Sequence, residues 1–393
     1  MSSHTRWTIA CFVLLLTACT TAPSPAGRTP TGPGTPPPSP RPSASPASPA
    51  SPAEPEPAPV SPEQAAGQRV VYSYPGAVPP DSLLATVREG RAAGVIFFKE
   101  NTADPAALRT AVDRLTEAQR QSPVDAPLLL MTDQEGGAVR RLPGAPELSA
   151  RQVGESADPV GTAARTGAEA GGNLAAAGLN TNLAPVLDVY RTPGDFIDTK
   201  QRSYGRDPSA VATLASAFAA AQRTAGVAAT AKHFPGLGSA PAGSNTDTGP
   251  VTLTLPLETL RAVDEAPYPA AIAAGVPLVM LSWAVYPALD AARPAGLSPT
   301  VVGGELRSRL GFRGVTLTDA LEAGALTGFG GTGERAVAAA AAGMDLLLCS
   351  ARDTAQGDEA AAALARALAD GSLDRAESAA AAARVAALRA GLR

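Results

Sequence analysis

Two adjacent residues, Lys232 and His233, stand at the end of a short apolar run, residues 226–231. Pro235 and two glycines follow them, which predicts that a strand ends here and a loop begins. This loop gathers small polar side chains, namely Ser239, Ser244, Asn245, Thr246, Asp247 and Thr248. They suit a hydroxyl-rich ligand, although the same residues also suit the turns of an ordinary surface loop.

Charged residues also follow several other apolar runs. They are Asp133, Arg140, Arg141, Asp188, Arg202 and Asp319. Taken singly, Asp188 or Asp319 is explained as the cap of the next helix, and Arg140 or Arg141 as a surface residue. Charged residues at five such places in one chain instead predict a shared polar site.

The apolar runs alternate with longer, alanine-rich segments of helical length. The runs are residues 94–98, 127–132, 179–185, 227–232, 276–282, 314–319 and 344–349, and the helical segments are 105–121, 159–177, 208–225, 257–274 and 333–342. Such alternation predicts a parallel sheet with helical crossovers. Seven or eight units favour an α/β fold of the (β/α)₈ TIM-barrel type over an open sheet. In a barrel, all the charged strand ends would meet at one mouth.

The two ends of the chain differ from this pattern. Residues 1–18 read as a signal peptide, and the Leu-Thr-Ala-Cys sequence ending at Cys19 has the form of a bacterial lipoprotein cleavage site. An ordinary secretory signal is the alternative. Residues 19–62 are rich in Pro, Ser and Ala and predict an extended tether, with recognition of proline motifs by a partner as a second use. Residues 63–393 form the expected barrel domain, and residues 358–393 predict one or two helices packed on its outside.

Composition excludes several classes of function. The net charge of −4 and the lack of a long basic run argue against nucleic acid as a partner. After removal of the signal, Cys19 and Cys349 are the remaining cysteines and His233 is the remaining histidine. With Cys19 acylated, no intrachain disulfide is possible, and a histidine-based metal site is not expected. We expect a monomer held at a membrane by its lipid.

Five motifs in order resemble those of glycoside hydrolase family 3, in its single-barrel bacterial β-N-acetylhexosaminidase branch. They are Asp-Gln-Glu-Gly-Gly from Asp133, Asn-Leu-Ala-Pro-Val-Leu-Asp to Asp188, Arg-Ser-Tyr-Gly from Arg202, Lys-His-Phe-Pro-Gly from Lys232, and Thr-Asp at Asp319. The resemblance covers residues 70–349. It implies a substrate with a terminal β-linked N-acetylglucosamine, such as peptidoglycan or its fragments.

The resemblance also implies roles for individual residues. Asp319 matches the nucleophile of a retaining glycosidase, which forms a glycosyl-enzyme. Neighbouring cations are expected to keep its carboxylate ionised. The residues matching those that hold the sugar hydroxyls are Asp133, Arg141, Arg202, Lys232 and His233. No metal or organic cofactor is expected, because side chains can supply both proton transfer and covalent catalysis.

The sequence departs from the family pattern at the general acid/base. Members usually carry an Asp-Ser-His triplet in the loop after Phe-Pro-Gly, and its histidine transfers the proton; here residues 243–245 read Gly-Ser-Asn. His233 matches a sugar-binding position instead. Asp247, two residues further on, is the expected replacement, with a structural role in the loop as its alternative.

Three functions are therefore compatible with the sequence. The first is an exported, membrane-anchored exo-β-N-acetylhexosaminidase on the outer face of the cytoplasmic membrane. The second is a family 3 enzyme of different specificity, such as a β-glucosidase or a phosphorylase. The third is a catalytically weak, tethered protein that binds cell-wall sugars, which the missing histidine would favour and the retained Asp319 would disfavour.

Overall fold

The computed structural model describes residues 61–392. The predicted signal peptide, Cys19 and all but the last two residues of the predicted tether lie outside this range. The described part begins with Ser61, which caps the short helix α1, Pro62–Gly67: its hydroxyl accepts a hydrogen bond from the Gln64 amide. Within residues 61–392, no helix combines the length and apolar character needed to cross a bilayer.

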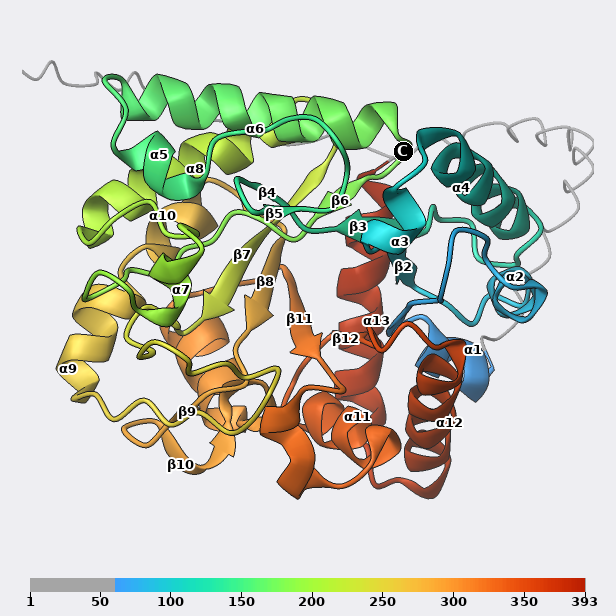
Figure 1. Cartoon of the computed structure of the whole chain (residues 1–393). Coiled ribbons are helices and arrows are strands. Elements are labelled where there is room, and N and C mark those ends of the chain that lie inside the picture. Colours follow the sequence, from blue (N-terminus) through green and yellow to red (C-terminus); the bar gives the residue numbers. More distant parts are fainter. Residues whose placement is uncertain (1–60, 393) are drawn as a thin grey trace, which may run out of the picture. The chain divides into compact units, whose positions relative to one another are not determined.

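Eight parallel strands close into a barrel, which confirms the predicted fold class (Figure 1). In chain order the strands are β1 Val70–Tyr72, β2 Gly94–Ile96, β3 Leu129–Thr132, β6 Thr181–Asn182, β7 Ala228–Phe234, β8 Leu278–Leu281, β11 Val315–Ala320 and β12 Leu346–Leu348. β1 pairs with both β2 and β12 and so closes the ring. The apolar runs of the sequence mark the other seven strands, whereas β1 has three residues and too little pattern to stand out.

Helices surround these strands (Figure 1). α4 Pro105–Arg120, α6 Pro159–Ala176 and α8 Pro208–Arg223 lie within two residues of the predicted segments, and so does α11 Thr332–Ala341. The first three share one start signal, an Asp-Pro pair. Asp104, Asp158 and Asp207 each accept a hydrogen bond from a backbone amide of the first turn. Proline then fits the first helical position, where its missing amide costs nothing.

One predicted helix, residues 257–274, is broken in the structure. It consists of α9 Leu257–Thr259, a π-turn at Leu260–Asp264, and α10 Tyr268–Ala273. Pro267 explains the break, because proline lacks an amide donor and disfavours helical geometry in the residue before it. The crossover between β8 and β11 is likewise π-helical, at Thr300–Arg309.

The last two helices behave differently from each other. α12 Thr354–Asp370 packs on the outside against α11, as expected. α13 Arg375–Ala390 instead lies across the amino ends of the strands, so the prediction of outside packing is wrong for this helix (Figure 1). Val385 joins the apolar cluster inside the barrel. Buried Arg389 donates to the carbonyl oxygens of Pro127 at 2.7 Å and Ala126 at 3.1 Å, just before β3. The bottom of the barrel is thereby closed, and its opposite end is left for a site.

Candidate active site

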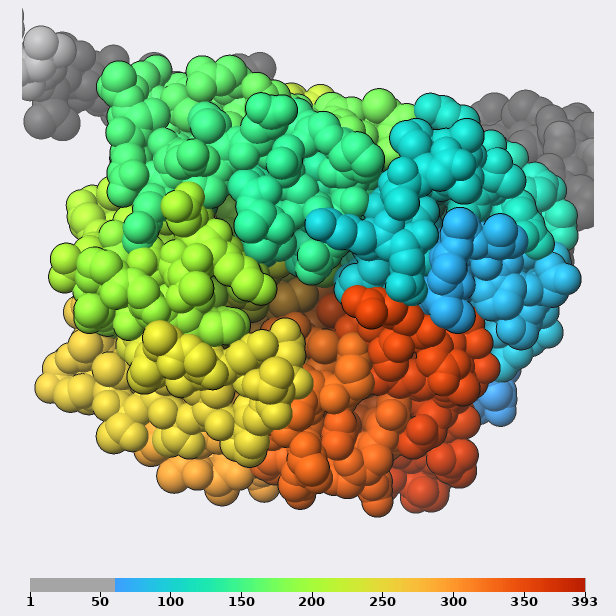
Figure 2. Space-filling view, viewed as in Figure 1, coloured from blue at the N-terminus to red at the C-terminus, as the bar shows by residue number. Residues whose placement is uncertain are grey.

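A hollow of about 600 Å³ opens at the carboxyl ends of the strands. Figure 2 shows a hollow near the middle of the viewed face, with segments from distant parts of the sequence around it. All seven residues predicted to act in catalysis or sugar binding line this cavity: Asp133, Arg141, Arg202, Lys232, His233, Asp247 and Asp319. Its volume is typical of pockets for small ligands.

The first wall of the cavity is a hairpin that follows β3. Its strands are β4 Gln134–Gly136 and β5 Val139–Arg140. Buried Gln134 fixes the hairpin, because its amide donates to Asn182 at 2.9 Å and its side-chain oxygen accepts from the amide of Leu142 at 3.0 Å. Arg140 serves the same purpose, donating to the carbonyl oxygens of Gly137 at 2.9 Å and Gly144 at 2.6 Å.

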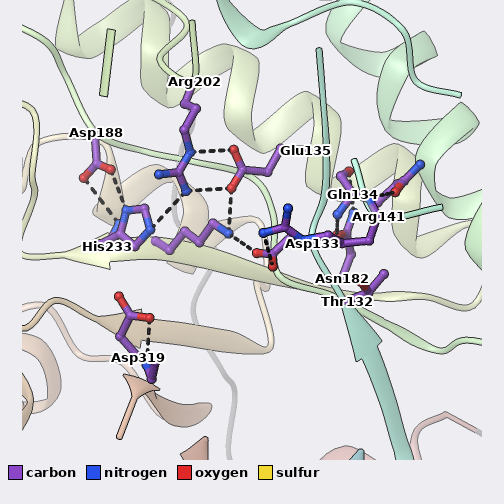
Figure 3. A network of polar contacts seen from close by, with 12 residues as sticks. Thr132, Asp133, Gln134, Glu135, Arg141, Asn182, Asp188, Arg202, His233 and Asp319 are labelled. Carbon is purple, nitrogen blue, oxygen red and sulfur yellow. Dashed lines mark hydrogen bonds and ion pairs between the residues drawn. The ribbon is translucent and has the colours of Figure 1, made fainter. Parts of the chain in front are cut away.

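Four charged side chains form a buried cluster between this hairpin and β7 (Figure 3). The Lys232 ammonium lies 2.7 Å from Asp133 and 2.7 Å from Glu135. The Arg202 guanidinium makes a two-pronged contact with Glu135, at 2.9 and 2.7 Å. Arg141 stands at the edge, 3.5 Å from Asp133. Paired, charge-assisted contacts of this kind fix side chains in one geometry.

The charges of this cluster hold each other in the ionised state. Burial by itself raises the pKa of Glu135, but Arg202 and Lys232 lower this pKa by more than burial raises it. The net pKa therefore lies well below the ordinary value. The pKa of Asp133 is lowered in the same way by Lys232 and Arg141 against the effect of burial. For Lys232, burial lowers the pKa and the two carboxylates raise it, with a net increase. The cluster therefore offers fixed acceptors and donors to the hydroxyls of a ligand.

His233 is held on both sides of its ring. Its Nδ1 lies 2.7 Å from Asp188, and its Nε2 lies 3.3 Å from Arg202. Asp188 is fully buried and also accepts from the amide of Leu237 at 2.7 Å. Because arginine can only donate, the contact with Arg202 is a hydrogen bond only when Nε2 carries no proton. Both ring nitrogens of His233 already have partners within the protein, which fits a binding role rather than that of a general acid.

Asp319 ends β11, apart from the charged cluster and below His233 in Figure 3. Its Oδ1 accepts a hydrogen bond from the amide of Ala320 at 2.8 Å. Burial raises the pKa of this carboxyl group, His233 and Lys232 lower it, and Asp247 raises it. The net pKa is above the ordinary value, so the expected influence of the cations is present but smaller than that of burial.

Asp247 reaches the cavity from the loop between β7 and α9. The loop is docked on the segment after β11: Gly324 donates to the carbonyl oxygen of Asp247 at 2.8 Å, and Ala325 donates to that of Thr246 at 2.9 Å. Gly324 is needed for this approach, since a Cβ there would lie 2.5 Å from the backbone of Thr248. The side chain of Asp247 is exposed. The structure therefore places it in the same cavity as Asp319, and among residues 61–392 its carboxyl group has no hydrogen-bond partner.

Sequence reasoning missed Glu135 as a site residue and noted Asp188 without giving it a role in the site. Glu135 lies two residues after Asp133, and in extended chain such residues point to the same side. That spacing is the signal from which it could have been found. Within residues 61–392, no three His, Cys, Asp or Glu side chains are grouped so as to hold a metal ion.

A closed barrel with a polar cavity of carboxylates and cations at the carboxyl ends of its strands has the layout of a barrel enzyme. Comparison with protein families agrees: residues 75–388 match the description "Glycosyl hydrolase family 3 N terminal domain". The chain belongs to glycoside hydrolase family 3, and it is a glycoside hydrolase with a carbohydrate substrate.

Individual relatives support this assignment. An "Uncharacterized secreted glycosyl hydrolase" of Arthroderma benhamiae is 48% identical over 79% of this chain and 88% of its own length. A "Beta-hexosaminidase" of Stenotrophomonas maltophilia is 35% identical over 65% of this chain and 75% of its own length.

Solved structures give the same fold. A β-N-acetylhexosaminidase of Beutenbergia cavernae has a TM-score of 0.76 and 35% identity, covering 85% of this chain and 99% of that one. A family 3 β-N-acetylglucosaminidase of Paenibacillus sp. has a TM-score of 0.78 and 34% identity, with 84% of this chain and 62% of that one covered.

Proposed function

We propose that this protein is a retaining exo-β-N-acetylhexosaminidase that removes terminal N-acetylglucosamine through a covalent glycosyl-enzyme on Asp319. The observation that carries the proposal is the meeting of Asp319, Asp247 and the buried charged cluster in one cavity. Relatives and solved structures named for hexosaminidase and β-N-acetylglucosaminidase activity support the specificity.

The charged cluster would bind the non-reducing end of the sugar. Asp133 and Arg141 face the cavity from the hairpin side, and Lys232 and His233 from β7. Each group is already oriented by a partner within the protein, so little side-chain entropy is lost when sugar hydroxyls bind. The sugar is thereby fixed with its anomeric carbon turned toward the β11 end of the cavity.

The chemical steps then need the two remaining carboxyl groups. In the first, Asp319 attacks the anomeric carbon, the bond to the leaving oxygen breaks, and Asp247 donates a proton to that oxygen. In the second, Asp247 removes a proton from water, which attacks the anomeric carbon and releases Asp319. The amide of Ala320 binds Oδ1 of Asp319, which leaves Oδ2 as the attacking atom.

We further propose that the enzyme acts on peptidoglycan or its fragments outside the cytoplasm, anchored through a lipid on Cys19. The signal-like residues 1–18 and the Pro-rich residues after Cys19 support this location. The Arthroderma benhamiae relative is itself named as secreted. Cys19→Ser should move the protein from the membrane fraction to the soluble fraction, because the acylated residue is lost. An unchanged distribution would contradict lipid anchoring.

Hydrolysis of two β-N-acetylglucosaminides, one with a good and one with a poor leaving group, tests the proposed chemistry. Asp319→Ala should abolish turnover of both. Asp247→Ala should lower kcat/KM for the poor leaving group by on the order of 10²- to 10⁴-fold and leave kcat/KM for the activated substrate unchanged, because only the poor leaving group needs a proton in the first step. Failure of the unmutated protein to hydrolyse either substrate, while still binding N-acetylglucosamine, would favour a sugar-binding protein instead.

A further inference from the structure

We propose that Arg352 recognises a carboxylate on the leaving-group side of the substrate, an inference that rests on the proposed function. Arg352 lines the cavity but takes no part in the charged cluster. About half of its side chain is exposed, at 53%. It therefore lies toward solvent, where the part of the substrate beyond the terminal sugar must emerge.

The backbone that carries Arg352 is braced residue by residue. Ser350 donates to Glu322 through its hydroxyl at 2.6 Å, and the amide of Ala351 donates to Gln356 at 2.9 Å. The amide of Arg352 itself donates to the hydroxyl of Ser73 at 2.8 Å. Three hydrogen bonds in succession give this short segment one geometry, so Arg352 is presented from a fixed support.

Glu322 belongs to this brace rather than to the chemistry. Besides Ser350, it accepts from Gln356 at 3.0 Å. Both oxygens of the Glu322 carboxylate are therefore engaged by partners within the protein. Its function here is to tie the segment after β11 to the segment after β12.

The backbone of Arg352 is itself unusual. Its φ is +60°, and Gln201, next to Arg202, is the other non-glycine residue with positive φ in the described part of the chain. This left-handed conformation is unfavourable for a residue with a Cβ. Both residues of this kind lie at or beside the cavity, and such conformations gather at functional sites.

The guanidinium is also fixed by its neighbours. It stacks over the ring of Phe98 with its carbon 4.8 Å from the ring centroid, and Phe98 lines the same cavity. Its one ion pair in the described residues is long, 4.0 Å to Glu100. At this distance Glu100 accepts no hydrogen bond from the guanidinium, and a guanidinium binds a carboxylate through paired, charge-assisted hydrogen bonds. Glu100 and the ligand would compete for the same group.

Two matched substrates test this assignment: β-N-acetylglucosaminides of 3-(4-hydroxyphenyl)propionate and of the corresponding propionamide. Their phenols leave equally well, so the ratio of their kcat/KM values reports recognition of the negative charge. For the unmutated protein, the ratio of acid to amide should be about two- to fivefold, the range of a half-exposed ion pair. It should fall when salt is added.

Two variants should change this ratio in opposite directions. Arg352→Gln should bring it close to one, and Glu100→Gln should raise it above the unmutated value. Arg366→Gln is the control, because Arg366 is exposed on α12 and does not line the cavity; it should leave the ratio unchanged.

The outcomes distinguish a failure of the proposed function from a failure of the role assigned to Arg352. Hydrolysis of neither substrate would overturn the proposed function itself. Hydrolysis of both, with a ratio that neither Arg352→Gln nor Glu100→Gln changes, would overturn the role of Arg352 and leave the proposed function intact.

Discussion

The ionisation of Asp319 depends on the neighbouring carboxyl group of Asp247. Burial raises the pKa of Asp319, His233 and Lys232 oppose that effect, and the negative charge of Asp247 adds to it. A nucleophile must be ionised, so activity should be lost as the pH falls through this pKa. The raised pKa therefore places the acidic limb of kcat/KM at a higher pH than an ordinary aspartate would.

Asp247→Asn should move that acidic limb to lower pH, because it removes a negative charge that disfavours ionisation of Asp319. The measurement is the pH profile of kcat/KM on the activated substrate, which does not need the general acid. Asp113→Asn, at an exposed position on α4, is the control. A limb that stays in place or moves to higher pH would contradict the electrostatic coupling of the two carboxyl groups.

Glu135 acts on the site through its neighbours. It makes ion-pair contacts with both Arg202 and Lys232, so it positions two residues that the sequence motifs identified. Its own role is indirect, since its oxygens are used within the cluster.

The position of the Asp247 loop depends on its docking against the segment after β11. Gly324→Ala should displace the loop, because the added Cβ would lie 2.5 Å from the backbone of Thr248. We expect kcat/KM to fall more for the poor leaving group than for the good one, since the proton donor moves while Asp319 stays in place. Gly328→Ala is a matched control from the same short helix, where nothing lies within 4 Å of the added carbon. Equal losses on both substrates, or no loss, would show that this docking does not position the acid/base.

The whole molecule shows how much of this arrangement the sequence predicts. Strand ends followed by charged residues predict the barrel and bring all seven candidate residues to one cavity, because parallel strands of a barrel share a carboxyl end. The positions of Asp133, Lys232 and Asp319 directly at the ends of apolar runs were enough to place these three residues. The ion pairs within the charged cluster could not be inferred from the sequence, since they depend on how the hairpin after β3 folds over the mouth of the barrel.

Other features of the fold cannot be recognised from the local sequence. β1 has three residues, and its place is set by pairing with β2 and β12. α13 has the composition of an ordinary surface helix, yet Arg389 finds its acceptors in carbonyl groups about 260 residues away along the chain. Arg352 lies far in sequence from Phe98, and their stacking appears only once the barrel is closed. Tertiary contacts of this kind cannot be inferred from periodicity or motifs.

The central claim is that Asp319 on β11 and Asp247 on a distant loop act as nucleophile and acid/base of one retaining reaction. Asp247→Ala should form the glycosyl-enzyme from an activated substrate but hydrolyse it slowly, because water then lacks its base. The most direct measurement is the mass of this variant during turnover, followed by peptide mapping. We predict a mass increase of one N-acetylglucosaminyl group on the peptide that contains Asp319, absent from the Asp247→Ala/Asp319→Ala double variant. Sugar release without any adduct, or an adduct on another residue, would contradict the account.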